Sequence, residues 1–133
     1  MRERAQAGSL GPRRLATLSV AGLLLAAAPA SAGGFSEKAK PELEALGSHA
    51  GYIAATIAPC GGNEAEVDYF TSQVRKMLEG IGGDEADFAI VQAAMDKGRA
   101  TAKPQGRDCT DEGGMALATK LVVLRDAIRE AGE

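Results

Sequence analysis

The apolar residues of segment 41–60 recur with alternating gaps of three and four positions, which is the spacing of one face of an α-helix. They are Leu43, Leu46, Ala50, Ile53 and Ile57. Proline is favoured in the first turn of a helix and ends a helix that precedes it, so Pro41 and Pro59 predict a helix from 41 to about 58. The apolar face of this helix needs partners to cover it, and Cys60 directly after the helix can supply a covalent one.

Three further segments, at about 63–79, 84–102 and 110–128, repeat this spacing. Their apolar positions are Val67, Phe70, Val74, Met77 and Ile81, then Phe88, Val91, Met95, Gly98 and Ala102, then Leu117, Leu121, Val122, Leu124 and Ile128. Each segment begins at a side chain that can cap a helix by accepting hydrogen bonds from its free amides. These capping residues are Asn63, Asp84, and either Thr110 or Asp111. Connectors rich in glycine or containing proline separate the segments, so the sequence predicts four helices and an all-α fold.

The two cysteines, Cys60 and Cys109, lie 49 positions apart in the first and third connectors. In an antiparallel up-down-up-down four-helix bundle these connectors lie at the same end, and the first and third helices are diagonal. We therefore predict such a bundle, with one disulfide joining the two loops at one end. Closing a loop of this length stabilises a fold by about 4 kcal/mol through chain entropy. A reactive or metal-binding pair is the alternative, but the cysteines lack CxxC spacing.

Residues 1–32 have the three parts of a secretory signal peptide. Arginines precede an apolar run at 15–28, and three small residues ending at Ala32 complete the pattern. Because the run is shorter than the roughly 20 residues of a membrane span, we predict cleavage after Ala32 instead of a membrane anchor. Residues 33–133 then form one helical-bundle domain, and its polar lead-in, 33–40, is expected to fray.

The charge of the mature chain differs from that of the whole sequence, which has 15 basic and 18 acidic residues. Without the four arginines and one glutamate of the leader, 11 basic and 17 acidic residues remain, a net charge of about −6. This charge repels nucleic acid and anionic lipid, so we expect no nucleic-acid partner and no membrane insertion after leader removal. A disulfide needs an oxidising compartment, which indicates a periplasmic or secreted protein of bacterial export.

His49 is the only histidine. It flanks the apolar face of the first helix, as Tyr52 does, and we interpret it as a boundary residue with its polar edge toward water. Catalysis by histidine requires a nucleophile and an orienting carboxylate, and Ser48 points about 100° away on a helix. Haem ligation by His49 and Met95 is the alternative, because both lie at similar depth in the bundle. We predict no catalytic residue, no cofactor and no metal site.

Two other patterns are compatible with either a ligand or ordinary packing. The first is the opening half of a calcium loop, formed by Asp108, Thr110, Glu112 and Gly113. The twelfth position of that loop should be a glutamate but is Thr119, so we interpret the carboxylates as helix caps. The second is a pair of small-residue stripes, which either let two helices approach closely or leave a cavity for an apolar ligand. They are Gly47, Ala50 and Ala54, and Ala94, Gly98 and Ala102.

Together these features favour a small exported helical protein that binds another envelope protein without catalysis. In general layout, a short acidic helical chain with two cysteines at this spacing resembles acid-stress periplasmic chaperones and some immunity proteins of secreted effectors. No residue motif of either group is present, so no functional residues are transferred. A chaperone-like stress function would follow if protonation of 17 carboxylates and His49 moved the net charge to about +12 and opened the bundle. The alternative function is a bundle that carries haem, a metal ion or a small apolar molecule.

Overall fold

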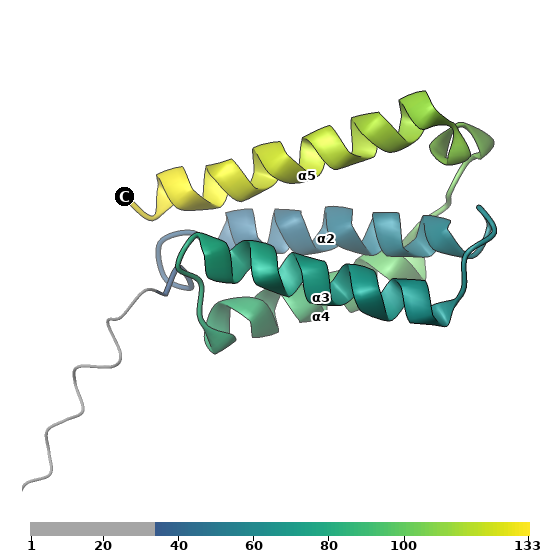
Figure 1. Ribbon diagram of the computed structural model, residues 1–133. Coiled ribbons are helices and arrows are strands. Elements are labelled where there is room, and N and C mark those ends of the chain that lie inside the picture. Colours follow the sequence, from purple (N-terminus) through teal and green to yellow (C-terminus); the bar gives the residue numbers. More distant parts are fainter. Residues whose placement is uncertain (1–33) are drawn as a thin grey trace, which may run out of the picture. The chain divides into compact units, whose positions relative to one another are not determined.

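The computed structural model describes residues 34–133, so the predicted leader and its cleavage point after Ala32 lie outside the described residues. Within 34–133 the chain forms four α-helices, one short 3₁₀ helix and no strand. The elements are α2 (Lys40–Ile57), α3 (Glu64–Gly80), α4 (Glu85–Thr101), the 3₁₀ helix η2 (Gly106–Cys109) and α5 (Asp111–Ala131). Consecutive α-helices run in opposite directions (Figure 1). The predicted all-α up-down-up-down four-helix bundle is confirmed.

The helices begin where the capping residues predict. In α3, α4 and α5, a side-chain oxygen of the residue before the helix accepts a hydrogen bond of 3.0 Å from the amide three positions later. These capping residues are Asn63, Asp84 and Thr110. Glycines make the turns that follow α2 and α3, since Gly61 and Gly82 have φ angles of +98° and +96°. Backbone of this kind strains any residue with a side chain, so these two turns depend on glycine.

The disulfide between Cys60 and Cys109 is present, with the two Cα atoms 5.3 Å apart. It joins the turn after α2 to the end of η2, at the same end of the bundle, as predicted. Both cysteines are exposed to solvent. The bond is consistent with a protein of an oxidising compartment. In the described part of the chain, no helix combines the length and the hydrophobicity needed to cross a membrane.

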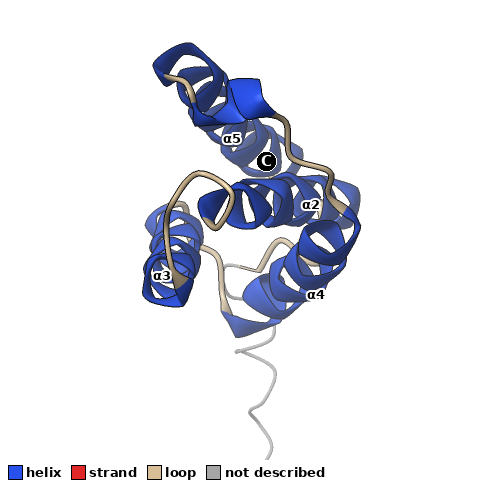
Figure 2. Ribbon diagram, turned by 90° about the vertical axis from the view of Figure 1, so that its right-hand side faces the viewer, coloured by secondary structure: helices blue, strands red, loops and turns tan. Residues whose placement is uncertain are grey.

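Helix α2 occupies the centre of the arrangement, with α3, α4 and α5 around it (Figure 2). It packs most extensively on α4, whereas α3 and α4 touch each other little and α5 packs chiefly on α2 and η2. The expectation that the first and third helices are diagonal is therefore wrong.

Glycines explain why α2 and α4 are neighbours. A Cβ atom on Gly47 would lie 2.5 Å from the carbonyl oxygen of Val91, and one on Gly98 would lie 2.6 Å from that of Ser48. Gly51 also faces the backbone of α4, so three glycines bring the two main chains into contact. Of the two outcomes that the small-residue stripes allowed, close approach is the one that occurs along this interface.

The hydrophobic core lies around α2. Its buried members are Ala39, Leu43, Leu46, Ala50, Val74, Leu78, Val91, Met95 and Ile128. Leu78 was not in the predicted stripe of its helix, whereas Ile53 and Ile57 of the predicted stripe are only half-buried. Val122 is 43% exposed, so it is not part of the core. Helix α5 is the least buried helix, because only Gly113 and Ile128 among its residues are fully covered.

Candidate functional site

Helix α5 is fastened to the bundle mainly near its two ends. At its start, Gly113 packs against the carbonyl oxygen of Arg107 in η2 so closely that a Cβ atom would not fit. Near its end, the side chain of Ile128 is completely buried in the core. Between these points the apolar stripe that faces α2 is only half-buried, and its members are Leu117, Leu121 and Leu124. The middle of α5 is therefore incompletely covered by α2.

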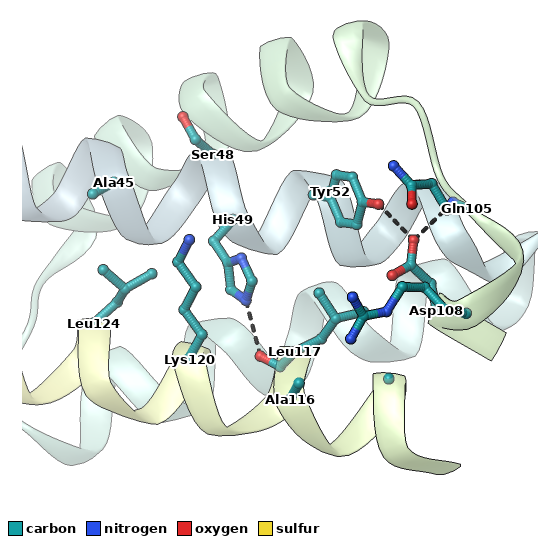
Figure 3. Close-up of a pocket in the computed structure, with 12 residues that line it drawn as sticks. Ala45, Ser48, His49, Tyr52, Gln105, Asp108, Ala116, Leu117, Lys120 and Leu124 are labelled. Carbon is teal, nitrogen blue, oxygen red and sulfur yellow. Dashed lines mark hydrogen bonds between the residues drawn. The ribbon is translucent and has the colours of Figure 1, made fainter. Parts of the chain in front are cut away.

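An open groove of about 820 Å³ lies along this incomplete contact (Figure 3). We call it the α2–α5 groove. Its lining residues are Ala45, Ser48, His49, Tyr52, Gln105, Arg107, Asp108, Gly113, Ala116, Leu117, Lys120 and Leu124. The apolar part of the lining comes from Leu117 and Leu124 of α5 and from alanines of both helices, of which Ala45 and Ala116 are exposed to solvent. A ligand could therefore reach apolar surface in the groove without unfolding of the protein.

His49 crosses the groove from α2 to α5. Its Nε2 atom lies 2.9 Å from the carbonyl oxygen of Leu117. Because a carbonyl oxygen only accepts, Nε2 carries the proton in this bond. The side chain is half-buried, as predicted for a boundary residue, but the expectation that its polar edge faces water is wrong. Burial lowers the pKa of His49, and the positive charge of Lys120 acts in the same direction, although the Leu117 bond opposes both.

Tyr52 and Asp108 close the groove at the end of the bundle that carries the disulfide, which we call the stapled end. The Tyr52 hydroxyl donates to Asp108 Oδ2 over 2.5 Å, and the backbone N–H of Gln105 donates to the same oxygen over 2.8 Å. These two bonds lower the pKa of Asp108, and the bond to Asp108 raises the pKa of Tyr52. Tyr52 is therefore held as a neutral phenol and Asp108 as a carboxylate. Neither is activated as a nucleophile or as a proton acceptor near neutral pH.

A second groove of about 520 Å³ lies on the other side of Tyr52, against the end of α4. Ser48, Tyr52 and Gln105 line both grooves, so the two hollows adjoin. We call the second one the α2–α4 groove. Its remaining lining residues are Lys97, Gly98, Thr101, Ala102 and Lys103.

The residues considered for haem ligation are not brought together. His49 lines the α2–α5 groove, whereas Met95 is buried and lines a different hollow between α3 and α4. In that hollow Arg99 pairs with Glu64 at 3.0 Å, which lowers the pKa of Glu64. No group of three or more potential metal ligands occurs within residues 34–133.

The half-match to a calcium loop folds in another way. Asp108 lies in η2, Thr110 caps α5, and Glu112 is already in the helix. A calcium loop needs non-helical backbone around the ion, and residues 111–119 are helical here. The interpretation of Thr110 as a cap is confirmed.

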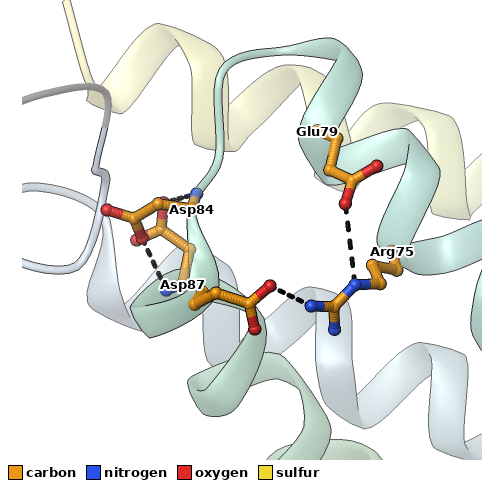
Figure 4. Close-up of polar contacts among 5 residues, drawn as sticks. Arg75, Glu79, Asp84 and Asp87 are labelled. Carbon is orange, nitrogen blue, oxygen red and sulfur yellow. Dashed lines mark hydrogen bonds and ion pairs between the residues drawn. The ribbon is translucent and has the colours of Figure 1, made fainter.

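Asp87 is a buried carboxyl group in the first turn of α4, at the end of the bundle opposite the disulfide (Figure 1 and Figure 4). Its carboxylate accepts hydrogen bonds from the backbone N–H groups of Phe35 and Asp84. Burial raises the pKa of Asp87, although these two donors act against the shift. The Phe35 ring packs against the core and against Gly132 at the end of α5. The described lead-in residues are therefore anchored, and the expectation that this segment frays is wrong. We assign Asp87 a structural role.

Sequence reasoning identified His49 and Tyr52 as residues at the edge of the core but did not predict the groove that they share. The partners that complete it, Asp108 and Lys120, lie on later elements, and no local pattern connects them with α2. No known protein family, curated protein or solved structure matches the chain.

Proposed function

We propose that the protein binds a helical segment of another protein in the α2–α5 groove and performs no catalysis. The observation that carries this proposal is the half-buried leucine stripe of α5, of which Leu117 and Leu124 line the groove. An amphipathic helix laid in a groove buries its apolar face against such a surface. Ala45 and Ala116 leave room on either side of the stripe, because each ends at Cβ.

The polar residues of the groove support binding over catalysis. The Nε2–H group of His49 is used by the Leu117 carbonyl, and the Tyr52 hydroxyl is used by Asp108. A nucleophile and a base would have to face each other and a substrate. Both of these side chains instead connect α2 to the elements that follow α4, so they maintain the shape of the groove.

Site-specific photo-crosslinking tests this proposal. A photoreactive phenylalanine analogue at Ala116 points into the groove, whereas the same analogue at Ala118 lies on an exposed part of α5 outside it. In cells that express the full chain, position 116 should give a discrete protein adduct and position 118 should not. Substituting Ala45→Trp fills the groove from the α2 side and should abolish the adduct. Equal adducts from both positions, or an adduct unaffected by Ala45→Trp, would contradict groove binding.

Export to the periplasm or beyond is part of the proposal. The disulfide supports it, since such bonds persist in oxidising compartments. Mass spectrometry of the protein from a periplasmic extract should give the mass of residues 33–133 less two hydrogens. Full-length protein with free thiols in the cytosol would contradict export.

A small amphiphilic molecule is the second candidate for the groove. Its volume of about 820 Å³ falls in the range of pockets for small molecules. Native mass spectrometry of protein purified from its own host distinguishes the two candidates. A retained non-protein mass that Ala45→Trp removes would favour the small molecule over a partner helix.

A further inference from the structure

The surface on both sides of Tyr52 is basic, in a domain whose net charge is about −6. Four cationic side chains line the two adjoining grooves, and all four are exposed. They are Lys97 and Lys103 in the α2–α4 groove, and Arg107 and Lys120 in the α2–α5 groove. Within residues 34–133 none of the four takes part in an ion pair, whereas Arg75, Arg99, Arg125 and Arg129 all do.

The only carboxylate that lines these two grooves is Asp108. Asp108 keeps its negative charge while Oδ2 accepts hydrogen bonds from Gln105 and Tyr52. These bonds and the charge of Arg107 lower the pKa of Asp108, so Asp108 offsets one of the four positive charges. The lining of the two grooves therefore carries three more positive than negative charges, although the domain has six more acidic than basic residues. Exposed cations gathered beside an apolar groove attract a ligand that combines apolar and negatively charged groups.

We infer that the occupant of the α2–α5 groove is an acidic amphipathic helix of a partner protein. This inference rests on the proposed function and adds the chemistry of the partner. The apolar face of the helix lies on Leu117 and Leu124, and carboxylates on its flanks reach Lys120 and Arg107 on one side. Carboxylates at the end that passes Tyr52 reach Lys97 and Lys103.

A protein helix fits this surface better than nucleic acid does. The acidic remainder of the domain repels a polyanion that extends beyond the grooves. Tyr52 and His49 are the only aromatic rings that line the two grooves, and both are held by hydrogen bonds within the protein, so successive bases have no series of free rings on which to stack. A short acidic helix, in contrast, places its charges only where the cations are.

Two synthetic peptides test the inference with purified residues 33–133. Both are helical, about 15 residues long, and share one leucine face; the polar face carries glutamates in one peptide and lysines in the other. Binding is followed through the backbone amide resonances of the ¹⁵N-labelled protein. The acidic peptide should shift the amides of Ser48, Tyr52 and Leu117, and its Kd should rise at least tenfold between about 50 and 300 mM salt. The lysine peptide should bind at least tenfold more weakly at low salt.

Charge reversal localises the effect. Lys97→Glu combined with Lys103→Glu should weaken the binding of the acidic peptide at least tenfold and strengthen the binding of the lysine peptide. Lys38→Glu combined with Lys40→Glu makes the same change in net charge at exposed positions outside both grooves, and it should change either Kd less than twofold. The amide spectrum of each variant verifies that the fold is retained.

The outcomes separate the two proposals. Equal binding of both peptides in the groove would overturn the acidic partner and leave helix binding intact. If neither peptide shifts the α5 amides, the result would count against helix binding itself. Tighter binding of a single-stranded oligonucleotide than of the acidic peptide would overturn the assignment of a protein partner.

Discussion

Helix α2 holds α4 and α5 in two different ways. Against α4, Gly47, Gly51 and Gly98 let the main chains meet, and the contact leaves no space for a side chain between them. Against α5, the start of the helix is held by η2 and Ile128 is buried near its end, and an open groove of about 820 Å³ lies between these points. Backbone contact makes the first pair a rigid unit. The second pair depends on a few attachments, so its central surface is available to a partner.

The largest expected effect comes from the attachment that is covalent. Replacing Cys60 and Cys109 by serine removes the bond that holds η2 and the start of α5 to the end of α2. The free energy of unfolding should fall by about 4 kcal/mol, the chain entropy of a loop of this length. Denaturant titration measures this, and oxidised protein treated with dithiothreitol should match the double variant. A loss below about 1 kcal/mol would mean that α5 is held by its packing rather than by the disulfide.

A substitution in the close contact between α2 and α4 should lower the free energy of unfolding by almost as much. In Gly51→Ala, the new Cβ atom would lie 2.7 Å from the amide nitrogen of Arg99 and closer to the Met95 carbonyl oxygen. The helices must separate, and we expect a loss of about 3 kcal/mol from overpacking. Gly114→Ala is the matched control on α5, where nothing lies within 4 Å of the new atom. It should gain up to about 1 kcal/mol in helix propensity. Equal effects of the two substitutions would contradict the distinction between the interfaces.

The sequence predicted the helices well because their limits are set locally. Capping side chains and glycine turns act within a few residues, so Asn63, Asp84 and Thr110 could be identified without the fold. The interfaces could not be predicted in the same way. Small residues permit close approach without requiring it, and the bond from Phe35 to Asp87 joins residues 52 positions apart. The groove follows from such long-range contacts, because its lining residues come from α2, from the segment around η2 and from α5.

A smaller loss of stability is expected when the contact of Phe35 near the end of α5 is removed. The half-buried ring of Phe35 packs against Gly132, so Phe35→Ala removes contacts near the end of α5 but keeps the backbone bond to Asp87. We expect the free energy of unfolding to fall by about 2 kcal/mol, less than for a fully buried phenylalanine. Tyr69→Ala removes an aromatic ring that is 67% exposed and should change stability by less than about 0.5 kcal/mol. Hydrogen exchange should accelerate around Ile128 in Phe35→Ala and stay unchanged between α2 and α4.

The smallest expected effect is on the pH dependence of stability, which should differ between the two ends of the bundle. The pKa of Asp108 is lowered in the folded protein, so its charged form stabilises the fold above the ordinary aspartate pKa of about 3.9. That contribution is lost as the pH falls through the lowered value. Asp87 has a raised pKa, so its protonation on acidification favours the folded state instead. Acid should therefore loosen the stapled end of α5 before the end anchored by Phe35 and Asp87.

Thermal unfolding from about pH 6 to pH 2 tests this difference. Asp108→Asn should lower the Tm near neutral pH, and its deficit relative to the native protein should shrink toward zero at the acidic end. Asp111→Asn removes the same charge without removing the bond to Tyr52, and it should keep the acid dependence of the native protein. If acid does open the groove in this way, the leucine stripe of α5 becomes more exposed, and the protein should reduce light scattering by an aggregating client at about pH 2 to 3. A deficit of Asp108→Asn that stays constant with pH would show that Asp108 does not control this end of the groove.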